Sequence, residues 1–315
     1  MESGLDTQTH AKYEQLIERT RAIPPTPTVV VHPCDETSLM GAVEAAQLGI
    51  ITPILVGPRR RIEAVAEKAG VDISRLRLED VPHSHAAAAR GVELIRAGAG
   101  ALLMKGSLHT DELMHEVTSS ATGLRTGRRI SHVFVMDVPT YPETLFITDA
   151  AINIFPDLDT KADIVQNAID LHVQIGFGMP RVAILSAVET VTTKIPSTIE
   201  AAALCKMAER GQITGGLVDG PLAFDNAIDM DAARIKNIHG EVAGRAQILV
   251  VPDLEAGNML AKNLTFLANA DAAGLVVGAR VPIVLTSRAD SVRSRMASCA
   301  IAALYAQSRP AIPGE

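Results

Sequence analysis

A serine and an arginine follow an apolar segment near the carboxyl end of the chain, in the run P-I-V-L-T-S-R-A-D-S (282–291). The apolar residues Ile283 to Leu285 predict a buried strand, which places Ser287 and Arg288 where a parallel strand would end. A guanidinium at that point can bind a phosphate or a carboxylate through two hydrogen bonds. The next residues, Asp290 among them, begin a predicted helix whose free N–H groups also attract anions. The run therefore predicts an anion site.

Four other predicted strands end in glycines, hydroxyls or charged side chains. These strands span 101–104, 182–185, 217–218 and 248–251. Glycines allow close backbone approach, and hydroxyls and helix N-termini donate hydrogen bonds to anions. Together they predict a cleft for a phosphorylated substrate. The candidate substrate-binding residues are Lys105, Gly106, Ser107, His109, Thr110, Ser186, Asp219, Gly220, Pro221, Asp253, Gly257 and Asn258.

Several of these side chains also have a purely structural interpretation. An aspartate directly after a strand is a common helix N-cap, which explains Asp219 and Asp253 at least as well as catalysis does. His109 is better explained as a structural or solvent-facing residue, and Lys105 fits a surface charge as well as a phosphate ligand. Cys34, in H-P-C-D, follows the first predicted strand, but nothing near it indicates activation of the thiol. A small buried hydrophobe is the favoured interpretation of Cys34.

The composition excludes several classes of protein. The 315 residues are 47% hydrophobic and 21% charged, an ordinary globular balance. Aromatic residues make up only 3% and the net charge is −7, which argues against a nucleic-acid partner. Three cysteines without CxxC spacing favour a reducing cytoplasm, and neither a signal peptide nor a membrane-spanning run is present. We therefore expect a cytoplasmic protein with no nucleic-acid and no membrane partner.

Short β-rich runs alternate with helical patterns along almost the whole chain. This order is typical of an α/β fold with a parallel sheet and helices on both faces. It changes once, where predicted strands at 130–138 and 145–151 are joined by the turn-rich D-V-P-T-Y-P-E-T, consistent with a hairpin. We expect the domain boundary there and the last strand and helix back in the first domain. The expected domains are 1–148 plus 282–315, and 149–281.

Seven segments in order make the chain resemble the phosphate acetyltransferase and phosphate butyryltransferase family, the phosphotransacylases. They are M-K-G-S-L-H-T, R-I-S-H-V, T-D-A-A-I-N, V-A-I-L-S-A-V-E-T-V, V-D-G-P-L-A-F-D-N-A, V-P-D-L-E-A-G-N-M-L-A-K and P-I-V-L-T-S-R-A-D-S, from Met104 to Ser291. The stretches S-A-V-E-T-V and T-S-R-A-D-S resemble the butyryl-type branch more closely.

The resemblance implies a two-domain, parallel-sheet-rich fold of the isocitrate and isopropylmalate dehydrogenase type, an active cleft between the domains, and a homodimer. It implies the reversible reaction of an acetyl- or butyryl-type acyl-CoA with phosphate to give acyl phosphate and CoA. Coenzyme A is then a substrate, and no cofactor or metal is tightly bound. Ser287 and Arg288 match the family's Ser-Arg pair, in which the serine lies near the CoA sulfur and the arginine grips phosphate and the developing oxyanion.

One position departs from the family pattern. Acetyl-type members carry an acidic residue about two helical turns after the Ser-Arg pair, credited with deprotonating the CoA thiol, and this chain has Ser294 there. Asp290 is the nearest acid and lies four residues earlier, hence on the same helical face. We assign it as the catalytic replacement, with stabilisation of the thiolate by Arg293 or Arg295 as the fallback. A helix N-cap explains Asp290 about equally well.

Two other functions remain compatible with the sequence. A metal-dependent dehydrogenase on the same fold could use Asp219, Asp225 and Asp253 as oxygen ligands for magnesium or manganese. No dinucleotide fingerprint follows any predicted strand, which disfavours it. A ligand-binding protein without activity would explain Ser294 in place of an acid. Phosphate acyl transfer is the favoured function.

Overall fold

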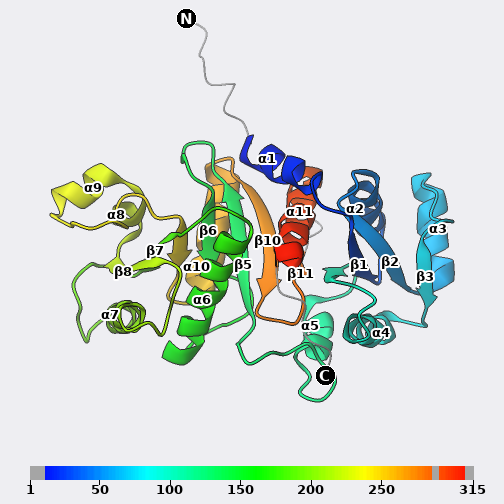
Figure 1. The fold of residues 1–315 in the computed structure, drawn as a ribbon, viewed down its shortest axis with the longest axis horizontal. Coiled ribbons are helices and arrows are strands. Elements are labelled where there is room, and N and C mark those ends of the chain that lie inside the picture. The colour runs from blue at the N-terminus through cyan, green and yellow to red at the C-terminus, as the bar shows by residue number, and fades with distance from the viewer. Residues whose placement is uncertain (1–10, 286–290, 309–315) are drawn as a thin grey trace, which may run out of the picture. The chain divides into compact units, whose positions relative to one another are not determined.

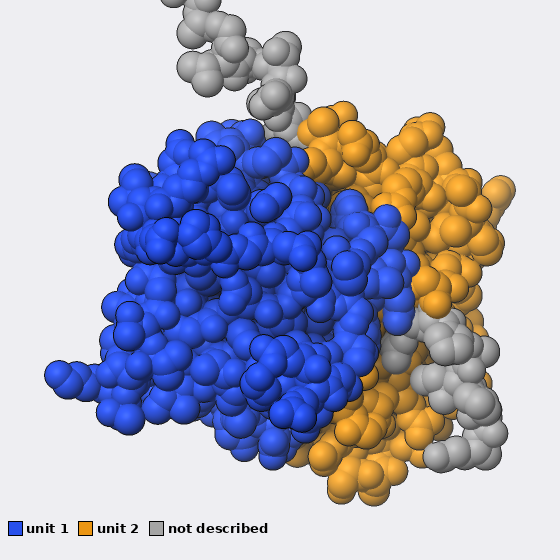
Figure 2. Space-filling model, turned by 60° about the vertical axis from the view of Figure 1, so that its left-hand side comes forward, with its two compact units in different colours: residues 1–10, 129–272 blue, residues 11–128, 273–315 orange. Residues whose placement is uncertain are grey.

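The computed structural model describes residues 11–285 and 291–308, and the chain divides into two compact units. Unit 1 contains Arg129–Ala272, and unit 2 contains Ala11–Arg128 and Ala273–Glu315. Figure 1 labels the elements of both units, and Figure 2 colours the units separately.

Unit 2 is built on a mostly parallel sheet. Its strands are β1 (Thr26–Val31), β2 (Ile51–Gly57), β3 (Arg77–Asp80), β4 (Leu102–Lys105), β10 (Asp271–Val277, whose first two residues belong to unit 1) and β11 (Ile283–Val284). Their order is β3-β2-β1-β4-β11-β10, with β10 antiparallel to β11. Because β11 pairs in parallel with β4, the last strand returns to the sheet formed by the first ones.

The helices of unit 2 follow its strands in alternation. They are α1 (Ala11–Thr20), α2 (Glu36–Gln47), α3 (Arg59–Ala69), α4 (Ser84–Arg96), α5 (Thr110–Thr118) and α11 (Val292–Ser308). The valines of β1 are completely buried, which is typical of a parallel strand with both faces covered. The direction in which successive strands are added reverses at β1: β2 and β3 lie on one side of β1, and β4 lies on the other side. This reversal is the topological switch point at which open α/β sheets bind ligands.

Unit 1 has a sheet of the order β5-β6-β9-β7-β8. The strands are β5 (Ser131–Asp137), β6 (Leu145–Thr148), β7 (Arg181–Leu185), β8 (Leu217–Leu222) and β9 (Ile248–Val250). The hairpin expected from the turn-rich connection is confirmed, since β5 and β6 are antiparallel neighbours. The other pairs, β6 with β9, β9 with β7 and β7 with β8, are parallel.

The helices of unit 1 are α6 (Leu158–Gln174), α7 (Pro196–Glu209), α8 (Phe224–Ile228), α9 (Met230–Ile235) and α10 (Leu254–Leu267). One of its hydrophobic clusters is almost entirely aliphatic and joins β6, β7 and β9 to α8, α9 and α10. Across the described part of both units, no helix is long and apolar enough to cross a lipid bilayer.

The short strand β3 stands at one end of the strand order and carries charges. Glu79 accepts hydrogen bonds from Arg77 in the same strand at 2.7 Å and from Arg90 of α4 at 2.9 Å. These bonds lower the pKa of the Glu79 carboxyl, so the strand keeps its negative charge between two cations.

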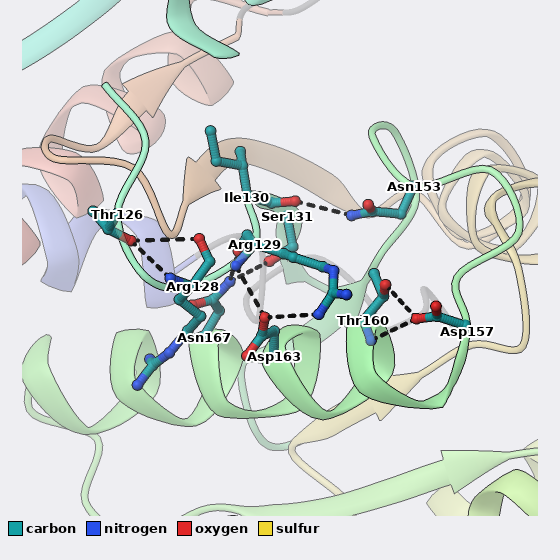
Figure 3. Close-up of polar contacts among 10 residues, drawn as sticks. All are labelled: Thr126, Arg128, Arg129, Ile130, Ser131, Asn153, Asp157, Thr160, Asp163 and Asn167. Carbon is teal, nitrogen blue, oxygen red and sulfur yellow. Dashed lines mark hydrogen bonds and ion pairs between the residues drawn. The ribbon is translucent and has the colours of Figure 1, made fainter. Parts of the chain in front are cut away.

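α6 holds the beginning of β5 through polar contacts, drawn in Figure 3. Asp163 accepts from the backbone N of Arg129 at 3.0 Å, and Asn167 donates to the Arg129 carbonyl and to the Ser131 hydroxyl, each at 2.9 Å. Asp157 caps the helix by accepting from Thr160 N at 2.8 Å. The start of the hairpin is therefore fixed by side chains of one helix.

Candidate functional site

The carboxyl ends of three strands of unit 2 lie side by side. Val31 of β1 pairs with Lys105 of β4, and Val284 of β11 pairs with Met104 of β4. H-P-C-D and K-G-S-L-H-T consequently leave the sheet at the edge where β11 also ends, next to the reversal between β1 and β4. The structure thus brings together two of the five predicted strand ends, the end at Met104 before K-G-S-L-H-T and the end of the strand that precedes Ser287 and Arg288.

The catalytic candidates Ser287, Arg288 and Asp290 lie outside the described residues, which resume at Ser291. The structure does describe the helix that follows. Ser291 caps α11, since its hydroxyl accepts from the backbone N of Ser294 at 3.0 Å. Asp290 itself lies outside the described residues, so its catalytic role and its role as a cap both stay predictions. Ser294 itself is 6% exposed and its hydroxyl accepts from that of Ser291.

The loop after β4 folds tightly onto the end of β1. Gly106 donates its backbone N–H to the Val31 carbonyl at 2.8 Å, and Ser107 donates its own to the His32 carbonyl at 2.9 Å. A Cβ atom on Gly106 would lie 2.4 Å from the Val31 oxygen and 2.5 Å from the His32 oxygen, so only glycine fits. The Lys105 ammonium donates to the carbonyls of Gly106 and Leu108 at 3.3 and 3.2 Å. The lysine thereby helps to shape the loop.

His109 and Thr110 begin α5 and are both exposed. His109 occupies the N-cap position, but its side chain makes no capping hydrogen bond. The solvent-facing interpretation of His109 is confirmed.

Cys34 lies in the same loop region and is buried. Burial raises the pKa of its thiol to about 11, so the thiol is protonated at neutral pH. A nucleophilic cysteine needs the opposite shift. The structure therefore supports the interpretation of Cys34 as a small buried hydrophobe.

Unit 1 brings a second set of strand ends to one edge of its sheet. Val250 of β9 pairs with Thr148 of β6 and with Ile184 of β7, in parallel on both sides. Ser186, directly after β7, is buried; its N–H donates to the Leu222 carbonyl at 2.9 Å. Its hydroxyl is 2.8 Å from that of Ser197 in α7. The Ser186 side chain is thus held by the protein itself.

The P-D-L-E-A-G-N segment after β9 is explained by helix packing. Asp253 is the N-cap of α10 and accepts from Ala256 N at 2.9 Å, which confirms its structural interpretation. A Cβ on Gly257 would lie 2.9 Å from the Asp149 oxygen, so the glycine lets α10 approach the end of β6. Asn258 donates to the Ala150 carbonyl at 3.4 Å.

Replacing Asp253 with alanine should lower the free energy of unfolding by about 1 kcal/mol, the usual cost of losing an N-cap, with little change in kcat. Asparagine at this position should restore most of the loss because its oxygen can still accept. Urea unfolding followed by circular dichroism measures the effect, with Glu255→Ala in the same helical turn as the control. A large loss of activity at unchanged stability would instead return Asp253 to the substrate site.

Asp219, Gly220 and Pro221 lie inside β8, which extends to Leu222. The prediction that these residues follow a strand ending at Val218 is wrong. The interpretation of Asp219 as a helix cap is also wrong, because α8 begins at Phe224 with Ala223 as its N-cap. The Asp219 carboxylate accepts from the N–H of the next residue at 2.9 Å.

A polar cluster around the buried Asp149, at the end of β6, was not predicted from the sequence. The Asp149 carboxylate accepts from the backbone N–H groups of Ala151, Ile152 and Asn153 at 3.0 to 3.1 Å and from the Asn153 side chain at 2.6 Å. Asn153 also donates to the Ile130 carbonyl at 2.9 Å (Figure 3). The motif T-D-A-A-I-N contained the signal, an aspartate at a strand end with an asparagine four residues later.

A second cluster that was not predicted links the loop after β7 to α8 and to the end of α9. Glu189, in S-A-V-E-T, accepts from the side chain of Asn226 and from Lys236 Nζ, the latter at 2.6 Å. The bond from Lys236 lowers the pKa of the Glu189 carboxyl, which therefore remains charged at neutral pH.

The aspartates of the dehydrogenase alternative are not gathered into a metal site. Asp219 lies in β8, Asp225 in α8 and Asp253 at the start of α10. Over residues 11–285 and 291–308, no group of three or more His, Cys, Asp and Glu side chains is placed to hold a metal ion.

Comparison with known proteins gives consistent matches. The family described as "Phosphate acetyl/butaryl transferase" matches residues 83–303. A phosphate acetyltransferase of Rhizobium meliloti is 75% identical over 301 residues, which cover 96% of this chain and 95% of that protein. A phosphate butyryltransferase of Clostridium beijerinckii is 40% identical, covering 93% and 97% of the two chains. The crystal structure of a branched-chain phosphotransacylase from Enterococcus faecalis has a TM-score of 0.78 at 28% identity, covering 89% of this chain and 99% of that one.

Proposed function

Because this chain belongs to the phosphate acetyl/butyryl transferase family, we propose that it transfers a short acyl group reversibly between coenzyme A and inorganic phosphate. The observation that carries the proposal is the 75% identity with a phosphate acetyltransferase over nearly the full length of both chains. The geometry of unit 2 supports it, since the strand before Ser287 and Arg288 ends beside the Lys105–Ser107 loop at the switch point of the sheet.

The chemistry requires positioning and charge stabilisation. A phosphate oxygen attacks the thioester carbonyl, the tetrahedral intermediate collapses, and CoA leaves as a thiolate while the acyl phosphate forms. Holding phosphate against the carbonyl makes the attack effectively unimolecular. Arg288 stabilises the oxyanion, and Ser287 lies near the sulfur. In the reverse direction Asp290 accepts the proton of the CoA thiol, the role that Ser294 cannot perform.

We further propose acetyl as the preferred acyl group. The identity with a phosphate acetyltransferase is 75%, against 40% for the butyryltransferase, although S-A-V-E-T-V and T-S-R-A-D-S resemble the butyryl-type branch. We also propose a cytoplasmic homodimer without a tightly bound cofactor, in which CoA is a substrate.

A thiol-release assay with acetyl-, propionyl- and butyryl-CoA tests these proposals. We expect phosphate-dependent release of CoA that needs no NAD and survives EDTA, with the highest kcat/KM for acetyl-CoA. Each extra methylene that a pocket buries contributes about 0.8 kcal/mol of binding, so an enzyme with a butyryl pocket would have a higher kcat/KM for butyryl-CoA than for acetyl-CoA. That result would contradict the acetyl preference and assign the enzyme to the butyryl type. Activity that appears only with NAD and a divalent metal would favour the dehydrogenase, and no release with any thioester would favour a silent binding protein.

A further inference from the structure

His32, the first residue after β1, has an unusual backbone conformation. Its φ is 55°, in the left-handed region that residues with a side chain seldom adopt, and it is 5% exposed. Its backbone N–H donates to the Val56 carbonyl of β2 at 2.7 Å, which holds the conformation in place. A strained residue of this kind, at the switch point of the sheet, indicates a functional constraint.

His32 makes repeated contacts with Ser107, which is 75 residues later in the chain. The His32 carbonyl accepts from the Ser107 backbone N–H at 2.9 Å and from its hydroxyl at 2.8 Å. The imidazole Nδ1 lies 3.2 Å from the same hydroxyl oxygen. The left-handed turn is what allows the carbonyl and the ring of one residue to reach one serine.

The hydrogen bonds of the Ser107 hydroxyl determine the imidazole tautomer. The single hydroxyl proton goes to the His32 carbonyl, which can only accept. The hydroxyl oxygen accepts from Cys34 N at 3.1 Å and has one lone pair left for the imidazole. Nδ1 therefore carries the proton, and Nε2 is unprotonated. Burial and the nearby Arg61 lower the pKa of His32, in agreement with a neutral ring.

The Ser107 hydroxyl is thus fully used inside the protein. It supports the loop and has no proton or lone pair to spare for a substrate. The loop it holds begins with Lys105 and leads into α5, whose first residue is Thr110 and whose N-terminus carries no side-chain cap. The Lys105 ammonium and the N–H groups at the start of α5 are therefore positioned by the hydrogen bonds between His32 and Ser107.

We propose that His32 is a positioning residue, whose Nδ1–H and carbonyl hold Ser107 so that the Lys105–Thr110 loop can bind a phosphate group of the substrates. This inference rests on the proposed acyl transfer and adds to it a residue that contacts no substrate. The phosphate is either the inorganic reactant or a phosphate of CoA, because both present the same oxygen acceptors to the loop.

The variants His32→Gly and His32→Asn separate the backbone from the side chain. Glycine adopts the left-handed φ without strain but removes the imidazole, whereas asparagine tolerates that φ and keeps an N–H near Ser107. Losing one such bond is worth about 1 kcal/mol, so His32→Gly should raise the KM of one substrate about fivefold at nearly unchanged kcat. His32→Asn should stay within about twofold of wild type.

Separate KM values for inorganic phosphate, CoA and dephospho-CoA identify the phosphate. A change confined to inorganic phosphate assigns the loop to that reactant, and a change for CoA that dephospho-CoA does not show assigns it to the 3′-phosphate. An equal change for both CoA forms assigns it to the diphosphate. Ser107→Ala should reproduce the effect of His32→Gly, and the double variant should be no worse than either single one.

Asn269→Gly is the matched control, because Asn269 has the same backbone conformation, with a φ of 53°, in the other unit. It should leave every KM unchanged. If His32→Gly and Ser107→Ala lower the melting temperature but leave all KM values at the wild-type level, His32 is merely structural and the inference is overturned. Wild-type thiol release is measured in the same series, so a failure of the proposed function is visible independently. Calorimetric titration with CoA and with phosphate then tests the loop without turnover.

Discussion

The Arg288→Ala variant is expected to lose about 2–4 kcal/mol of transition-state stabilisation, a roughly 30- to 900-fold drop in kcat/KM. The reason is that the guanidinium has two tasks in the proposed reaction, to bind phosphate and to stabilise the negative charge on the carbonyl oxygen. Arg288→Lys should recover only part of the rate, since an ammonium keeps the charge and loses the planar pair of donors. Thiol release under saturating and limiting phosphate measures both effects.

The control for Arg288 is Arg75→Ala, which removes an exposed arginine before β3 in the same unit. Its kinetics should match those of wild type. Near-normal turnover in a folded Arg288→Ala protein would remove this arginine from the mechanism. The family assignment would be unaffected, because it rests on the sequence matches.

The Gly106→Ala variant is expected to lower the free energy of unfolding by about 2–4 kcal/mol. The added methyl group would meet two backbone oxygens, at 2.4 and 2.5 Å, and backbone atoms cannot rotate away as a side chain can. The end of β4 must therefore move from β1, which also strains the 2.8 Å bond from Gly106 N to the Val31 carbonyl. Urea unfolding measures the loss, and the displaced loop should raise the KM of the phosphate-bearing substrate.

Gly127→Ala is the comparison for Gly106. A Cβ at Gly127 would meet no atom within 4 Å, so this variant should be as stable as wild type. If the two alanine variants unfold at the same urea concentration, the tight junction between β1 and the loop after β4 is not a feature of the protein in solution.

Much of the fold could be predicted because its strands are short and buried. The valines of β1 and the first three residues of β4 are continuous apolar runs, and a strand covered on both faces needs no polar alternation. The hairpin of β5 and β6 was recognisable because its connection is rich in turn residues. β8 was predicted too short, since D-G-P has the composition of a turn. β8 can include D-G-P because it is the outermost strand of the order and its register with β7 is shifted at this point.

The site divides into what local sequence encodes and what only the folded chain assembles. The cap at Asp253 is local, so the aspartate before a helical pattern was a sufficient signal. The His32–Ser107 contact joins residues 75 positions apart, and no local sequence pattern marks His32 for the left-handed region. The bond that caps α11 from Ser291 is local, but it was not predicted, because Ser291 follows an aspartate that is an equally good type of cap residue.

The charged end of the sheet at β3 has a consequence for how this protein behaves at high concentration. An outermost strand offers unpaired backbone groups on which a strand of another molecule can add. Here an added strand would desolvate the Arg77 guanidinium and the Glu79 carboxylate, which is already paired with the guanidinium groups of Arg77 and Arg90. That desolvation penalty opposes edge-to-edge growth, and neutralising the charges should make the protein prone to assemble into fibres.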